Sequence, residues 1–261
     1  MHCLLCGHDD FHDVYADSDL LVVKCRKCGL VFQRTEDTDA GSLEDYYRKR
    51  STESRLKWSG STRRLLDVIT EIAAAYPGGK LLDVGCGSGE FLNAMSQAGL
   101  ESVGLEPNSM QAEFARRQGL NVVNEPLKEG LFPPAHFDVI TFLQVLEHVP
   151  DPVQTLRLTK DYLRRDGLVV LDVPSYNNPR FLLYRATGIK QIVRKDFIGP
   201  HLFYYTPRTL SDIVRQSGLE VLHLDIGRYN VKYGPNILLK FVDGVARRFE
   251  IGGIVLYATN R

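Results

Sequence analysis

The chain of 261 residues lacks a net charge, because 32 acidic side chains balance its 32 basic ones. Without an overall field, nothing attracts it at long range to nucleic acid or to a membrane. It also lacks an apolar run of the roughly 18 residues that a membrane-spanning helix needs. Its first residues, Met-His-Cys, do not begin a signal peptide. We therefore expect a soluble, cytoplasmic protein without a transmembrane segment.

Cysteine is scarce and unevenly distributed. Of the five cysteines, four lie within the first 28 residues as two C-x-x-C pairs, each followed by a glycine. A C-x-x-C turn directs two thiolates at one ion, and two such turns complete a tetrahedral zinc site. The pattern predicts a zinc ribbon over residues 1–35, with the ligands Cys3, Cys6, Cys25 and Cys28. Because four thiolates close the coordination shell, the ion is expected to be structural.

Two other interpretations of the cysteine pairs fit less well. A secreted disulfide scaffold would need the signal sequence that is missing here. A redox-active C-x-x-C would follow a strand in a β-α-β unit and would not be doubled. Zinc ribbons also bind proteins or nucleic acid, and the mixed charge of this one leaves a docking role open.

Beyond the ribbon, the pattern changes twice along the chain. Residues 36–78 are expected to form a helical connector or cap, with a charged helix over 42–58 and an amphipathic helix over 62–76. From Lys80 onward, short apolar runs alternate with helical stretches, which is typical of β-α-β units and a parallel sheet. The predicted strands are 80–84, 101–105, 121–123, 137–142, 168–173, 219–226 and 254–259, and the predicted helices are 90–98, 108–118, 152–165 and 206–218. The expected fold class is α/β, a doubly wound and mostly parallel seven-stranded sheet over residues 79–261.

A glycine-rich loop follows the first strand of this predicted sheet. The run Asp83-Val84-Gly85-Cys86-Gly87-Ser88-Gly89 carries three alternating glycines that permit a tight turn and a close approach of a ligand. An acid, Glu106, follows the next strand and can bind both ribose hydroxyls of a nucleoside. A dinucleotide-binding G-x-G-x-x-G loop would need a glycine at position 90, where the chain has Glu90. The pattern therefore favours a nucleoside-containing ligand other than a dinucleotide.

The run resembles the E/D-x-G-x-G-x-G signature of class I S-adenosylmethionine-dependent methyltransferases, within the subgroup that modifies ubiquinone precursors, sugars and other small molecules. The resemblance extends over residues 80–259 and includes Gln144-Val-Leu-Glu147-His148 after the fourth strand. It implies that the cofactor S-adenosylmethionine is bound by these residues: Asp83, Gly85, Gly87, Gly89, Glu106, Asn124 and Gln144. By this resemblance Glu106 would hold the ribose and Asn124 would lie near the adenine, where the family often has an acid. Cys86 is expected to serve packing.

Three residues are candidates for the chemistry of methyl transfer: Glu147, His148 and His201. A histidine titrates near working pH and can remove a proton from the acceptor. Both histidines could instead have purely structural contacts in their loops. Some relatives hold a divalent metal at this motif beside a catechol, but there the first position is an acid and here it is Gln144. Because an amide is a poorer ligand for a hard cation, metal-dependent catechol methylation is not favoured.

The segment 179–205 is long for a connection and is expected to be a lid or a specificity element. Its first part carries five basic residues and no acid: Arg180, Arg185, Lys190, Arg194 and Lys195. This charge could attract an anionic acceptor, an anionic membrane surface or RNA, or could be a solvated helix face. Four tyrosines, Tyr46, Tyr47, Tyr204 and Tyr205, could cap the acceptor or simply pack.

Together these features predict a methyltransferase that acts on a small-molecule acceptor, through O-methylation of a hydroxylated metabolite or sugar derivative. The alternatives are an RNA-modifying enzyme that uses the ribbon and the basic segment, and a non-catalytic scaffold that only binds the cofactor. Nucleic acid is the less expected partner because the chain is neutral overall. Peripheral membrane contact stays open, and the sequence does not predict an oligomeric state.

Overall fold

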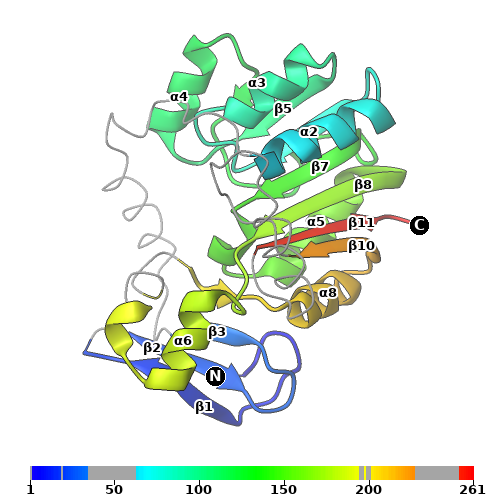
Figure 1. Cartoon of the computed structure of the whole chain (residues 1–261). Helices are drawn as coiled ribbons and strands as arrows, with labels where there is room; N and C mark the ends of the chain where they lie inside the picture. The colour runs from blue at the N-terminus through cyan, green and yellow to red at the C-terminus, as the bar shows by residue number, and fades with distance from the viewer. Residues whose placement is uncertain (1, 19, 35–62, 194–196, 198–200, 227–252) are drawn as a thin grey trace, which may run out of the picture.

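The computed structural model describes residues 2–18, 20–34, 63–193, 197, 201–226 and 253–261. It contains a large, mostly parallel β-sheet that is covered by helices, and a small antiparallel β-sheet (Figure 1). The charged helix predicted over 42–58, with Tyr46 and Tyr47, lies outside the described residues, as do Arg194 and Lys195. None of the helices that the structure describes has the length and the apolar character needed to span a bilayer.

The large sheet has seven strands in the order β10-β11-β8-β7-β4-β5-β6. The strands are β4 (Lys80–Val84), β5 (Glu101–Leu105), β6 (Val122–Val123), β7 (Phe137–Leu143), β8 (Leu163–Val173), β10 (Glu220–Ile226) and β11 (Ile254–Thr259). All neighbours are parallel except β11, which runs antiparallel to both β8 and β10. The chain order reverses between β4 and β7, and ligands of open α/β sheets bind at the carboxyl ends of the strands at such a point.

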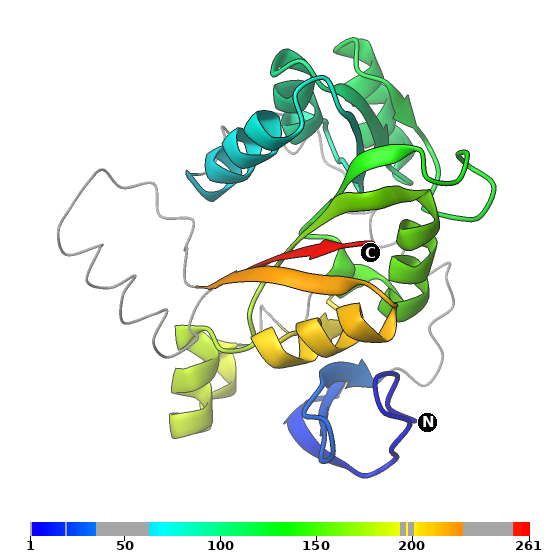
Figure 2. The same cartoon turned by 90° about the vertical axis from the view of Figure 1, so that its right-hand side faces the viewer.

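Helices cover both faces of this sheet, and each face has its own apolar core. On one face lie α2 (Arg63–Ala75), α3 (Glu90–Gln97) and α4 (Ser109–Arg117), and on the other lie α5 (Pro152–Tyr162) and α8 (Pro207–Gln216). Figure 2 shows α2 and α5 on opposite sides of the strands. Alternate strand residues supply the two cores, so that Leu81 packs with the first set of helices and Leu82 with the second.

One helix prediction was too long. The helix expected over 152–165 ends at Tyr162, and Leu163 already has the extended conformation of β8. Leu163 is buried and pairs with Phe137 of β7, so burial in the sheet outweighs the helical spacing of the preceding residues. The strand then passes through Asp166, which has a φ of 59°, before the regular pairing resumes at Leu168.

The small sheet contains β1 (Phe11–Ala16), β2 (Leu21–Cys25), β3 (Val31–Arg34) and β9 (Phe203–Tyr204), all antiparallel. Its first three strands belong to the predicted zinc ribbon, whereas β9 comes from the far end of segment 179–205. Val31 pairs with Tyr204 and Phe32 with Phe203. Two distant parts of the chain therefore share one sheet, and Figure 1 shows helix α6 (Pro179–Thr187) lying beside it.

Candidate active site

The glycine loop lies at the carboxyl end of β4 and has the backbone conformation that its glycines permit. Gly85, Gly87 and Gly89 have φ values of 71°, 56° and 84°, which side chains other than glycine rarely adopt. A Cβ atom on Gly85 would lie 2.6 Å from Cγ2 of Val145, just beyond β7. The loop is thus packed directly against the segment that carries Glu147 and His148.

Glu106 holds this loop to the tip of β5. Its Oε2 accepts a hydrogen bond of 2.8 Å from the Gly87 amide, and its Oε1 accepts one of 2.7 Å from the Asn108 amide. The residue is 7% exposed. Burial raises the pKa of Glu106, while the two amide hydrogen bonds oppose that rise. Each carboxylate oxygen has a second lone pair, so the group retains the capacity to accept from ribose hydroxyls.

Asp83 is the last but one residue of β4 and is almost completely buried. Its Oδ1 accepts a hydrogen bond of 2.7 Å from the hydroxyl of Thr141 in the neighbouring β7. Burial, opposed in part by the Thr141 hydrogen bond, raises the pKa of Asp83 to about 7, and the negative charge of Glu106 adds to the rise. Two acids with raised pKa values therefore flank the glycine loop, which makes this loop a candidate binding site.

Asn124 lies just after β6 and is oriented by its amide group. Its Nδ2 donates to the carbonyl oxygens of Glu106 at 2.7 Å and of Pro107 at 3.0 Å. Both amide hydrogens are committed in this way, so only Oδ1 is available to accept from a nucleobase.

Gln144 follows β7 with a φ of 61°, a conformation that is strained for a residue other than glycine. Its Nε2 donates to Oδ1 of Asp172 at 2.9 Å, and its backbone amide donates to the Asp172 carbonyl at 2.7 Å. Gln144 therefore joins the ends of β7 and β8. Such strain is common at functional turns.

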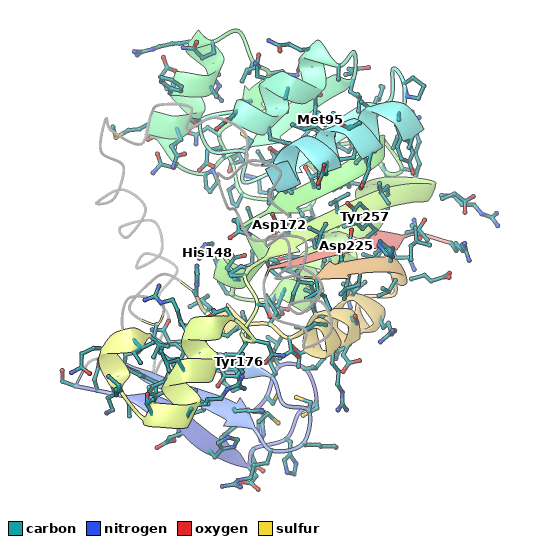
Figure 3. All side chains as sticks on the ribbon, viewed as in Figure 1. Met95, His148, Asp172, Tyr176, Asp225 and Tyr257 are labelled. Carbon is teal, nitrogen blue, oxygen red and sulfur yellow. The ribbon has the colours of Figure 1, made fainter. Side chains whose placement is uncertain are left out.

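The three residues expected to do the chemistry are brought together by the structure. Glu147 and His148 lie in a short 3-10 helix, η2 (Leu146–His148), and His201 comes from the segment before β9. The rings of His148 and His201 are 4.8 Å apart, and Oε1 of Glu147 lies 3.8 Å from Nε2 of His148. Figure 3 shows His148 and Asp172 at the ends of β7 and β8 that face helix α6.

This group combines burial with partial access. The Glu147 side chain is 1% exposed and that of His148 is 15% exposed. One ligand atom from each of Glu147, His148 and His201 lies within 4.8 Å of the others, so the trio could also hold a metal ion. A buried carboxylate beside two imidazoles can accept a proton or stabilise a protonated ring.

The four ribbon cysteines also converge. Sγ of Cys3 lies 3.5 Å from Sγ of Cys28, and the Sγ atoms of Cys6 and Cys25 are equally far apart. All four ligand atoms lie within 4.8 Å of one another. Four sulfurs around one zinc, with Zn–S bonds of about 2.3 Å, would be about 3.8 Å apart, whereas a disulfide requires about 2.05 Å. The donor set therefore fits a tetrahedral zinc ion.

Several other residues singled out in the sequence are buried and serve packing. Tyr205 is fully buried, and its hydroxyl donates to the Leu146 carbonyl at 3.1 Å. Tyr204 is 4% exposed, and its ring lies 6.1 Å from that of His201. Burial raises the pKa of Cys86, and its Sγ would lie 2.5 Å from a Cβ on Gly104, as expected of a packing residue.

Sequence reasoning missed Thr141 and the pairing of β3 with β9. The alternation of β7 could have identified Thr141, because a polar residue in the middle of a buried apolar run needs a partner. The strand β9 gave no such signal, since it has only two residues and its partner lies about 170 residues away in the chain.

Comparison with known proteins agrees with this architecture. A family model described as a methyltransferase domain matches residues 57–224. The ubiquinone biosynthesis O-methyltransferase of Bordetella avium is 31% identical over 179 residues, which are 65% of this chain and 72% of that protein. The Pseudomonas aeruginosa enzyme of the same name is 32% identical over 159 residues, or 57% of this chain and 67% of that protein.

Solved structures share the fold at lower identity. The 1,6-didemethyltoxoflavin-N1-methyltransferase of Burkholderia thailandensis, solved with S-adenosylhomocysteine, has a TM-score of 0.56 at 17% identity and covers 96% of this chain and 99% of its own. The [4+2]-cyclase SpnF has a TM-score of 0.55 at 17% identity, and the match covers 84% of this chain and 92% of SpnF. At such identities the likeness shows the fold alone.

The family match and the sheet order define the class of protein. The chain belongs to the methyltransferase-domain family and is an S-adenosylmethionine-dependent methyltransferase of the class I fold.

Proposed function

We propose that this protein methylates the oxygen of a small hydroxylated acceptor, such as a phenol or a sugar derivative. The observation that carries the proposal is the close approach of Val145 to Gly85, where an added Cβ would lie 2.6 Å from Cγ2, because it brings the glycine loop against the turn that bears His148. A methyl donor above the loop would then face the two histidines. The names of the curated relatives, ubiquinone biosynthesis O-methyltransferases, support an oxygen acceptor.

The cofactor would lie across the carboxyl ends of β4, β5 and β6. Its contacts are proposed to come from Asp83, Gly85, Gly87, Gly89, Glu106, Asn124 and Gln144. Glu106 would accept from the ribose hydroxyls, and Oδ1 of Asn124 would accept from the adenine amino group. S-adenosylmethionine supplies an activated methyl group on a sulfonium, so the protein needs to orient the acceptor and to remove its proton.

The proton of the acceptor is proposed to go to His201 or His148. As the acceptor oxygen bonds to the methyl carbon, the bond from that carbon to sulfur breaks, leaving S-adenosylhomocysteine, a methyl ether and a protonated imidazole. The buried carboxylate of Glu147, 3.8 Å from Nε2 of His148, would stabilise the positive charge on the ring pair. This role makes Glu147 a positioning and electrostatic residue rather than the base.

A metal is not needed for this scheme. The first position of the motif is the amide Gln144, and its Nε2 is committed to Asp172. Gln144 could bind a cation only through its carbonyl oxygen, which is a poorer ligand for a hard cation than a carboxylate. We therefore propose metal-independent transfer at this site and structural zinc at the four cysteines, in a cytoplasmic protein with ribbon 1–35, cap 36–78 and methyltransferase domain 79–261.

The test is the transfer of a labelled methyl group from S-adenosylmethionine into a small-molecule extract, with the products identified by mass spectrometry. We expect label in a methyl ether, with no loss of activity when added magnesium is omitted. Label on RNA would contradict the small-molecule acceptor. Activity that depends on an added divalent cation would instead assign Glu147, His148 and His201 to a metal site.

A further inference from the structure

The backbone of Leu202 makes hydrogen bonds in two directions. Its carbonyl oxygen accepts from the amide of Gln33 in the ribbon at 2.8 Å, and its amide donates to the carbonyl of Glu147 at 2.8 Å. Leu202 directly follows His201 in the chain. One residue thus connects strand β3 of the ribbon to the turn that carries Glu147 and His148.

A second set of contacts joins the ribbon to segment 179–205. The hydroxyl of Tyr184 in α6 donates to the Val14 carbonyl of β1 at 2.8 Å. The ring of Phe197 lies 4.9 Å from that of Tyr15 and 5.0 Å from that of Tyr204. Both Tyr15 and Phe197 are at most 2% exposed, so the segment shares a dry aromatic core with the ribbon.

The glycine loop, which is the proposed cofactor-binding half of the site, is held in place by other hydrogen bonds. The Gly85 amide donates to the Leu105 carbonyl at 2.7 Å, and the Gly87 amide donates to Glu106. These contacts lie within the large sheet and its loops. Glu147 and His148 follow β7 of the same large sheet, whereas His201 lies in the segment that leads to β9 of the small sheet. The small sheet therefore reaches the histidines through β9.

We propose that the zinc ribbon is the positioning element of the acceptor half of the active site. The four cysteines fit a zinc ion that would hold β2 and β3 in place, and β3 in turn holds β9. Leu202 then fixes His201 relative to Glu147 and His148. This inference rests on the proposed function, because it takes the two histidines as the proton-accepting pair.

The sharpest test removes one hydrogen bond between the two parts. Gln33→Pro removes the amide that donates to Leu202, whereas Gln33→Ala keeps this amide and removes the same side chain. Because the N–H and C=O of one strand residue face the same neighbour, the proline spares the bonds of β3 to β2. We expect Gln33→Pro to keep its zinc and its S-adenosylmethionine affinity, to exchange the Leu202 amide about tenfold faster, and to lower kcat at least tenfold.

The control Gln33→Ala should behave as the wild type in all four measurements. Wild-type exchange of the Leu202 amide and wild-type kcat in a zinc-loaded Gln33→Pro protein would overturn the proposal. A second experiment does not depend on a variant. Removing zinc from the wild-type protein with a chelator should speed amide exchange over residues 201–205 and leave S-adenosylmethionine affinity within about threefold; unchanged exchange there would also overturn it.

The outcomes separate this proposal from the proposed function. Amide exchange needs no acceptor, so it can support the positioning role even where no methyl ether is found. Conversely, unchanged exchange would remove the role of the ribbon and leave methyl transfer at the large sheet intact.

Discussion

The amide of Gly87 donates a hydrogen bond of 2.8 Å to Oε2 of Glu106, and this contact ties the loop after β4 to the tip of β5. The same carboxylate holds the start of the next helix through the amide of Asn108. A single buried acid therefore shapes the loop, and its remaining lone pairs would accept from the ribose of the proposed cofactor. Loss of this residue should affect cofactor binding more than any surface charge on the same strand.

Glu106→Ala should lower the affinity for S-adenosylmethionine at least about 100-fold, because it removes the carboxylate to which the two ribose hydroxyls are proposed to donate hydrogen bonds. Isothermal titration calorimetry measures this directly. Glu101→Ala is the matched control, since Glu101 starts the same strand, is well exposed and should leave the affinity unchanged. Equal affinities of the two variants would refute the ribose assignment of Glu106.

Gly85 of the loop can be compared with Gly99, which also has a positive φ but has free space around it. Gly99 has a φ of 92°, and a Cβ there would meet nothing within 4 Å, so Gly99→Ala should cost about 1–2 kcal/mol of unfolding free energy. Gly85→Ala should cost more and also weaken S-adenosylmethionine binding, because its Cβ would lie 2.6 Å from Val145. Denaturant unfolding and calorimetry provide both numbers. Similar losses in the two variants would mean that the Val145 contact is not tight.

Asp83 should make stability depend on pH. The pKa of Asp83 is raised to about 7 in the folded protein, whereas its ordinary value is 3.8. Because the folded-state pKa is raised, the proton bound to Asp83 stabilises the folded protein. This stabilisation is complete below pH 3.8 and is lost as the pH rises to about 7. Asp83→Asn should therefore gain stability relative to the wild type over this window, by up to about 4 kcal/mol above pH 7.

Urea unfolding of wild type and Asp83→Asn between pH 4.5 and 8 checks this sign. A matched variant is Thr141→Val, which keeps the shape and removes the hydrogen bond to Asp83. It should raise the pKa of Asp83 further. The loss of unfolding free energy with rising pH should therefore occur at higher pH in this variant than in the wild type. A constant difference between wild type and Asp83→Asn at all pH values would contradict the raised pKa.

The ribbon should hold about one zinc ion per chain. Cys6→Ser or Cys28→Ser should lose the metal and the amide protection of residues 11–34, because structural zinc supplies much of the folding free energy of such small units. The fifth cysteine gives the control, since Cys86→Ser should retain the zinc. Elemental analysis measures the zinc content, and hydrogen exchange measures the amide protection of the ribbon. A metal-free ribbon with full amide protection would refute structural zinc.

The sequence predicted the seven strands and the glycine loop because both depend on local patterns. Apolar periodicity identified the strands, and the alternating glycines with Glu106 indicated the methyltransferase family, which the family match and the curated relatives confirm. The roles of the individual site residues stay predictions. The coupling of Gln33 to Leu202 could not be predicted, because it depends on a two-residue strand paired across most of the chain.

The helix boundary at Tyr162 illustrates a second limit. Helical spacing continues to Arg165, yet the burial of Leu163 against Phe137 favours the strand. Tertiary packing therefore overrides a local pattern at this position.

The most direct test of the central claim follows one methyl group by NMR. With 13C-methyl S-adenosylmethionine and the acceptor from the extract, the methyl resonance should move from the sulfonium to an ether position, with one S-adenosylhomocysteine formed per ether. His201→Asn and His148→Asn should bind the cofactor normally, and the variant that lacks the base should lose about 100-fold or more in kcat. A methyl group found on nitrogen or carbon, or full rates in both histidine variants, would contradict this account.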